Sequence, residues 1–106
     1  TYPYRAATPD KQLDLLSCGP LTFSAPDEEA FPCLRIAKDC AAAGGTACAI
    51  MNGANEVAVA QFLRGEIGFN DIARRVERAL SRVAVKYQPS LGDILEADRL
   101  GREAAR

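Results

Sequence analysis

The sequence NDIARRVERALSRV, residues 70–83, carries the strongest helical pattern in the chain. Its apolar side chains recur every three or four residues, at Ile72, Val76, Leu80 and Val83. The opposite face carries four arginines, Arg74, Arg75, Arg78 and Arg82. Asn70 is a candidate N-cap, and Asp71 favours the positive end of the helix dipole. The stretch therefore predicts an amphipathic helix with one face buried against other helices.

Three further helices are expected around this one. The first begins near Pro32, where the missing N–H costs nothing, and stops at Gly44-Gly45. The second lies within Thr46–Arg64, and the last opens at Ser90, with Asp93 completing a capping box. Their expected core positions are Phe31, Leu34, Ile36, Ala37, Cys40, Ala41, Ile50, Met51, Val57, Ala58, Phe62, Ile94, Leu95 and Leu100. Short connections between four helices predict a mainly α fold, a small four-helix bundle-like domain over residues 27–106.

Residues 1–26 differ in composition from this helical region. They contain Pro3, Pro9, Pro20 and Pro26 and lack helical periodicity, which predicts an extended linker. Residues 13–16 and 21–23 are candidates for short extended pieces. Thr1 is neither a Met nor the start of a signal peptide, so we expect the chain to be a part of a longer protein. The apolar side chains of the linker would then form an exposed seam: Leu13, Leu15, Leu16, Leu21 and Phe23.

Composition limits the function of the 106 residues. Of the side chains, 48% are apolar and 25% are charged, which is typical of one globular domain. The net charge of −1 argues against a nucleic-acid partner or a membrane surface. The chain has no His, which excludes His-based triads and zinc sites that need imidazole.

The four cysteines, Cys18, Cys33, Cys40 and Cys48, contain no C-x-x-C pair. A zinc knuckle or a thioredoxin-like redox pair is therefore not supported. We expect small buried hydrophobic residues in a reducing cytoplasm, with a structural disulfide as the alternative.

The most unusual polar feature is the cluster Asn52-Gly53-Ala54-Asn55-Glu56, which lies within an apolar run. One interpretation is a ligand site in which Asn52, Asn55 and Glu56 orient a bound molecule. The other is structural: an asparagine caps a helix start, or the buried polar groups bond to one another. The structural interpretation is favoured because these residues commonly act as caps.

The remaining polar groups favour structural roles as well. Gly44-Gly45-Thr46 lacks a phosphate-binding pattern and fits a helix C-cap better. Asp93 and Glu96 lie one helical turn apart, with Asp98 on a neighbouring face, and would need partners from elsewhere to hold a metal. The residues 74–82 arginine face is typical of a solvated surface. No nucleophile, base and oxyanion donors come together, so no catalytic, cofactor-binding or metal residue is assigned.

Five further motifs are LTFSAPD at 21–27, FPCL at 31–34, MNGANEVAVAQFL at 51–63, FNDI at 69–72 and SLGDILEAD at 90–98. In their order and spacing these motifs resemble the 1-deoxy-D-xylulose 5-phosphate (DXP) reductoisomerase family. The resemblance also includes residues 2–5 and 13–15 and so covers nearly the whole chain. In the FNDI motif, Asn70 replaces a threonine of the family pattern.

The resemblance implies a C-terminal structural domain of a three-part, cytoplasmic, homodimeric enzyme. That enzyme converts DXP to 2-C-methyl-D-erythritol 4-phosphate in isoprenoid biosynthesis, with NADPH and a divalent cation (Mg or Mn). The family's cofactor, metal and phosphate residues have no counterpart here, so the chain alone is expected to be inactive and its partner to be the rest of the same polypeptide. Two rivals remain: a free-standing helical interaction module, and a small enzyme built on Asn52, Asn55 and Glu56.

Overall fold

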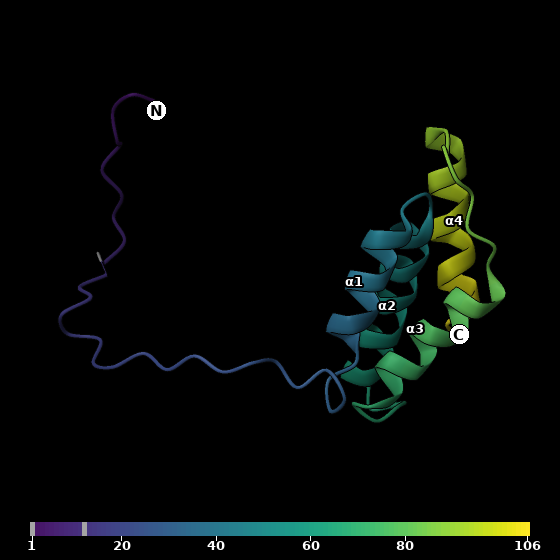
Figure 1. The fold of residues 1–106 in the computed structure, drawn as a ribbon, viewed down its shortest axis with the longest axis horizontal. Coiled ribbons are helices and arrows are strands. Elements are labelled where there is room, and N and C mark those ends of the chain that lie inside the picture. Colours follow the sequence, from purple (N-terminus) through teal and green to yellow (C-terminus); the bar gives the residue numbers. More distant parts are fainter. Residues whose placement is uncertain (1, 12) are drawn as a thin grey trace.

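The computed structural model describes residues 2–11 and 13–106 and has four helices in this part of the chain (Figure 1). They are α1 (Cys33–Ala43), α2 (Ala47–Leu63), α3 (Asp71–Arg82) and α4 (Leu91–Ala104). All four helices predicted from the sequence are present, each within a residue or two of its expected start. The mainly α, four-helix architecture is confirmed.

The N-terminal segment runs away from the helices as an extended chain (Figure 1). The radius of gyration of 18.6 Å exceeds the roughly 13 Å expected for a compact domain of this length, because the segment projects outward. Its described residues include a turn at 15–17 but no strand, so the predicted extended pieces do not pair. A short extended stretch needs a partner strand to form a sheet, and none lies beside it.

Helix α2 is the centre of the bundle and contacts each of the other three helices. Its buried side chains Ile50, Ala54 and Ala58 face α1, α3 and α4. The other helices complete the core with Ile36 and Cys40 from α1, Ile72, Ala73, Val76 and Ala79 from α3, and Ala97 from α4. The helical periodicity of α3 is confirmed, since Ile72 and Val76 are buried and Leu80 and Val83 pack against the core.

Helices α2 and α4 approach each other through small residues. Ala97, Gly101 and Ala105 recur every four residues and are all buried, so α4 presents a flat stripe to α2. A Cβ atom added at Gly101 would lie 2.5 Å from the Ile50 carbonyl oxygen. Larger side chains on this stripe would push the two helices apart.

This close approach corrects part of the expected core. Ile94 and Leu95 of α4 are exposed because the small-residue stripe, rather than the bulky side chains, faces α2. Phe31, Leu34 and Phe62 are also exposed, whereas the sequence pattern placed them in the core. Ala41, in the last turn of α1, is exposed as well.

The helix ends mostly follow the expected signals. Gly44 ends α1 with a positive φ of 70°, and its N–H donates to the Cys40 carbonyl. The capping box of α4 is present, with bonds between the Ser90 and Asp93 backbone N–H groups and each other's side chains. Asn70 is the exception: its side chain caps nothing, and the Asp71 carboxylate instead accepts a bond from the Gly68 N–H at 2.9 Å.

The chain after α3 is fixed to the start of α2 by Thr46. This side chain is almost fully buried, and its hydroxyl accepts a hydrogen bond from the Lys86 N–H at 2.9 Å. The Thr46 N–H in turn donates to the Lys86 carbonyl at 3.1 Å. This reciprocal pair joins two connections that lie 40 residues apart and so sets the path into α4.

Candidate functional site

The polar cluster at residues 52–56 divides between two sides of α2. Because α2 begins at Ala47, Asn52 and Asn55 lie inside the helix, and the prediction that one of them caps a helix start is wrong. Asn52 and Glu56 lie one turn apart, and the Asn52 amide donates to the Glu56 carboxylate at 3.2 Å. Asn55 lies on another side and lines a separate pocket. The three residues therefore do not form one site.

Glu56 is held by Arg102 of α4. The Arg102 guanidinium lies 2.8 Å from the Glu56 carboxylate and 2.7 Å from that of Asp98. Hydrogen bonds to Asp98, and then to Glu56, raise the pKa of Arg102 above its ordinary value. This group joins α2 to α4, as in the structural interpretation of the cluster. Sequence reasoning missed Arg102, although its spacing of four residues from Asp98 was a usable signal.

The pocket beside Asn55 has a volume of about 220 Å³ and lies where the N-terminal segment enters the bundle. Its walls come from the lead-in to α1, the middle of α2 and the start of α3, and are almost entirely apolar. They are formed by Ala30, Phe31, Pro32, Cys33, Asn55, Val59, Phe69, Asn70, Ile72 and Ala73. At this size the pocket falls below the roughly 300–1,000 Å³ typical of small-molecule sites.

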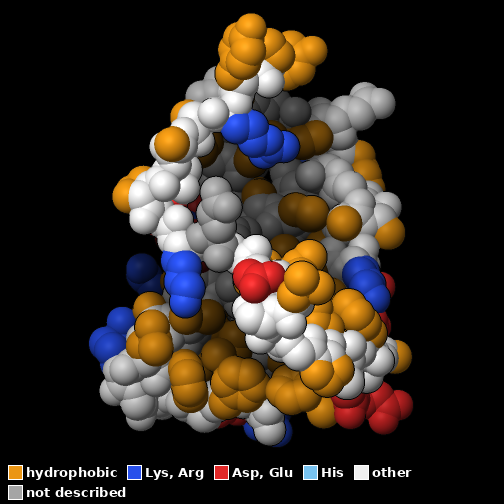
Figure 2. Space-filling model, turned by 90° about the vertical axis from the view of Figure 1, so that its left-hand side faces the viewer, with side chains coloured by type: hydrophobic (Ala, Val, Ile, Leu, Met, Phe, Trp, Pro, Cys, Tyr) orange, Lys and Arg blue, Asp and Glu red, His pale blue; other side chains and the backbone are white. Residues whose placement is uncertain are grey.

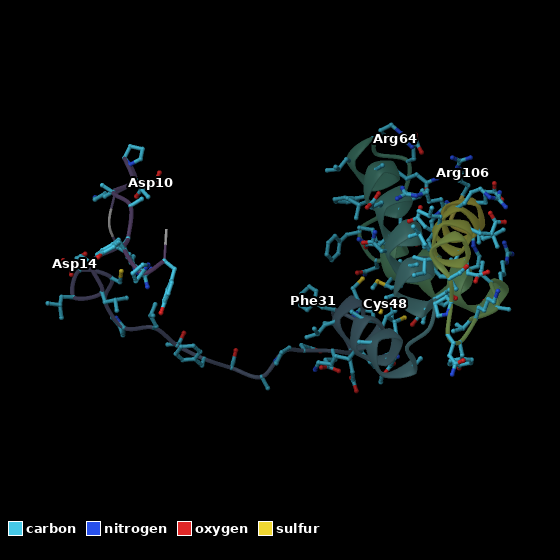
Figure 3. All side chains as sticks on the ribbon, turned by 90° about the horizontal axis from the view of Figure 1, so that it is seen from above. Asp10, Asp14, Phe31, Cys48, Arg64 and Arg106 are labelled. Carbon is cyan, nitrogen blue, oxygen red and sulfur yellow. The ribbon has the colours of Figure 1, made fainter. Side chains whose placement is uncertain are left out.

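Two aromatic rings form the exposed edge of the pocket. Phe31 is 59% exposed and Phe69 is 57% exposed, which is unusual for aromatic side chains in a bundle this small. Phe69 also packs edge-to-face on Phe62, with ring centroids 5.8 Å apart. Figure 3 shows Phe31 on the side of the bundle that is turned toward the extended segment. Two exposed aromatic side chains therefore lie beside the point of chain entry.

The polar groups of the pocket are two carboxamides, those of Asn55 and Asn70. Neither side chain forms a hydrogen bond with another described residue, and the Asn70 side chain does not cap α3 as expected. Next to the pocket lies a depression that shares Ala30, Pro32, Asn70 and Ala73 and adds the charged residues Glu29, Arg74 and Glu77. An apolar centre with a charged rim is the usual composition of a protein interface.

Figure 2 views the molecule from the side of the N-terminal segment. Hydrophobic side chains gather in the lower part of this face, and single Lys, Arg, Asp and Glu side chains lie around them. The segment itself adds exposed apolar side chains, from 68% exposed at Leu15 to 97% at Leu16. The expected seam of Leu13, Leu15, Leu16, Leu21 and Phe23 is exposed in the structure.

The other carboxylates of the sequence analysis take part in local contacts. Asp93 binds the Lys86 ammonium at 2.5 Å and accepts bonds from Ser90, and these contacts hold its pKa well below the ordinary value. Glu96 pairs with Arg99 at 2.5 Å, which lowers the pKa of Glu96. Among the residues that the structure describes, no three His, Cys, Asp or Glu side chains group together as a metal site.

The arginine face of α3 is also engaged in structural contacts. Arg74 pairs with Asp71 at 2.8 Å. Arg75 donates to the carbonyl oxygens of Ala105 and Arg106, at 2.7 and 2.6 Å, and so caps the end of α4. Arg74 therefore forms an ion pair within α3, whereas Arg75 binds backbone carbonyl groups at the C-terminus.

The cysteines only partly match the expectation. All four are free thiols, and only Cys40 is buried, which raises the pKa of its thiol. Cys18, Cys33 and Cys48 are exposed, so the prediction of four buried cysteines is wrong for these three. Cys48 lies in the first turn of α2, and Cys33 lies at the pocket.

None of the helices in the described part of the chain is long and apolar enough to cross a membrane. The fold is a small all-α domain of four helices with an apolar pocket where the N-terminal segment enters. A family model described as the DXP reductoisomerase C-terminal domain matches residues 1–104. The chain belongs to this family.

Individual relatives agree with the family match. The chain is 46% identical over 106 residues to 1-deoxy-D-xylulose 5-phosphate reductoisomerase of Ruminiclostridium cellulolyticum, covering 100% of the chain and 28% of that protein. It is 47% identical over 104 residues to the enzyme of Methylobacillus flagellatus, covering 98% and 26%. The solved reductoisomerase of Zymomonas mobilis in complex with NADPH superposes with a TM-score of 0.85 at 41% identity, covering 98% of this chain and 28% of that one.

These coverages have two consequences. The chain spans only about a quarter of the length of the curated relatives it matches. The superposition on the Zymomonas protein covers 98% of the chain, so it includes the extended N-terminal segment as well as the bundle. The extended conformation of this segment therefore also occurs in a relative whose chain is much longer.

Proposed function

We propose that the chain serves as the C-terminal structural domain of a DXP reductoisomerase. The observation that carries the proposal is the family match over residues 1–104, and the exposed Phe31 and Phe69 at the apolar pocket support it. In this proposal residues 1–26 connect the domain to the catalytic part, and residues 27–106 form the supporting bundle.

The complete enzyme would convert DXP to 2-C-methyl-D-erythritol 4-phosphate, as a cytoplasmic homodimer that uses NADPH and a divalent cation. Both groups would bind to the rest of the polypeptide. A relative in complex with NADPH supports the cofactor. Among the described residues the carboxylates do not fit a metal, because they are paired with Lys or Arg or lie apart. No residue of the chain is assigned a catalytic, cofactor-binding or metal-binding role.

The support would work through rigidity. The bundle is fixed internally by the α2–α4 contact, by the Arg102 ion pairs and by the Thr46–Lys86 pair. The surface on which a partner would pack is already rigid, so little conformational entropy is lost on docking. The catalytic part would thereby be held in one arrangement.

The test is NADPH binding by titration calorimetry, with the 106-residue chain and the complete polypeptide measured side by side. We expect binding to the complete polypeptide and none to the chain. Binding of NADPH to the 106-residue chain would refute the supporting role. The alternative of a free-standing interaction module predicts a gene without an upstream reading frame for a dinucleotide-binding domain, so the genomic sequence separates the two.

A further inference from the structure

We infer that the pocket formed by residues 30–33, α2 and α3 binds one apolar side chain from the preceding part of the same polypeptide. Asn55 and Asn70 bind the backbone beside that side chain. This inference rests on the proposed function and assigns the docking contact to named residues.

The chemistry of the pocket fits a protein side chain better than a metabolite. Its walls are apolar, its volume is about 220 Å³, and no Lys or Arg lines it. A phosphorylated or dinucleotide ligand would require cationic groups or several backbone N–H donors. A branched aliphatic or aromatic side chain requires only apolar walls and a fitted shape.

The two carboxamides give the pocket its polar specificity. Each has one acceptor oxygen and two N–H donors, so it can bind both the C=O and the N–H of an incoming backbone. Neither Asn55 nor Asn70 uses its side chain within the described part of the chain. By contrast, the neighbouring Asn52 is already bound to Glu56.

The position of the pocket identifies the occupant. Ala30, Phe31, Pro32 and Cys33 form one wall, so the segment that links the bundle to the preceding part of the polypeptide leaves the bundle at the edge of the pocket. The chain is 26–28% of the length of its relatives, so nearly three quarters of such a protein remains to pack near this edge. A tethered partner has a high effective concentration, which favours it over a separate protein.

The first experiment is hydroxyl-radical footprinting of the 106-residue chain at low concentration and of the complete polypeptide. We expect Phe31 and Phe69 to react about threefold or more slowly in the complete polypeptide, because docking removes them from water. Leu91 is the matched control, since it is 71% exposed and lies at the start of α4, away from the pocket. It should react equally in both.

The outcomes separate this inference from the proposed function. If Leu13–Phe23 become protected while Phe31 and Phe69 do not, the domain docks through its segment alone; the proposed function stands and the pocket inference fails. If neither group is protected, both fail. If Phe31 and Phe69 are protected in the 106-residue chain and sedimentation shows a dimer, a second copy occupies the pocket and the inference also fails.

The second experiment isolates the polar contacts. Asn55→Ala should lower the melting temperature of the complete polypeptide and leave that of the 106-residue chain unchanged or slightly higher, because the partner is present only in the former. Asn52→Ala is the control, and it should have the same effect in both. An Asn55→Ala variant with equal effects in the two proteins would overturn the role assigned to Asn55.

Discussion

Gly53 of α2 lies against the backbone of Asp98 in α4. A Cβ atom added at Gly53 would be 2.6 Å from the Asp98 carbonyl oxygen and 2.9 Å from its carboxylate. With Gly101 against Ile50, this makes a two-sided contact in which each helix supplies one glycine. The separation of α2 and α4 therefore has no room for a single methyl group at either position.

Gly53→Ala is expected to destabilise the fold by about 2 kcal/mol or more, because a rigid backbone must move to admit the methyl group. The free energy of unfolding in urea measures the effect. Gly92→Ala, in α4, is the matched control: the nearest atom to its added Cβ is 3.8 Å away. Since alanine favours a helix more than glycine, this variant should be neutral or slightly stabilising. Equal losses in both variants would contradict the close contact.

Thr46→Val replaces the buried hydroxyl by a methyl group of similar size. The Lys86 N–H loses its acceptor, so we expect a loss of about 1–2 kcal/mol. Hydrogen exchange should show a faster Lys86 amide in this variant. Thr46→Ser keeps the hydroxyl and should keep the slow exchange at Lys86, even if the missing methyl group costs some stability. An unchanged Lys86 amide in Thr46→Val would refute the pair.

Asn55→Ala in the 106-residue chain should leave the stability unchanged or raise it by up to about 0.7 kcal/mol, because alanine has the higher helix propensity. The reason is that Asn55 lies in mid-helix and caps nothing. Glu56→Gln should instead lower the melting temperature, since it removes the charge that pairs with Arg102. High salt should reduce this difference, as expected for a partly exposed ion pair.

The stability of the bundle should fall in acid partly through Asp93. Lys86 and Ser90 hold the pKa of this carboxyl below its unfolded value of about 3.9. A lowered pKa in the folded state adds stability above the unfolded pKa, and this stability is lost as the pH falls through the folded pKa. Melting temperatures from pH 6 down to about pH 2 should therefore decline less steeply in Asp93→Asn than in the parent chain. Parallel curves would contradict the assignment.

The exposed seam predicts self-association of the 106-residue chain. Its leucines and Phe23 lie outside any core, and an unpaired extended edge can pair with a second chain. Analytical ultracentrifugation should show concentration-dependent association of this chain and a monomer for a chain that begins at Pro26. If both sediment as monomers and hydrogen exchange protects residues 13–23, the segment belongs to the bundle instead.

The sequence by itself determined the number, order and ends of the helices. Gly44 and Ser90 act through their own backbone or the next turn, so their effect can be read without knowledge of the neighbours. The buried face of α3 could also be predicted from the sequence, because a single strong stripe of apolar residues fixes which side is buried. At the start of α3 the local signal was misleading because two groups competed, and Asp71 rather than Asn70 bonds to the preceding loop.

Only the tertiary structure decided which faces meet and what they leave open. Helix α4 offers both a bulky side with Ile94 and Leu95 and a small-residue stripe with Gly101, and the choice depends on the close fit to α2. The partner of Glu56 is Arg102, which lies 46 positions away, and the pocket of Asn55 needs walls from three separate parts of the chain. Such contacts depend on distances in space between segments that are remote in sequence. Periodicity along one helix carries no information about those distances.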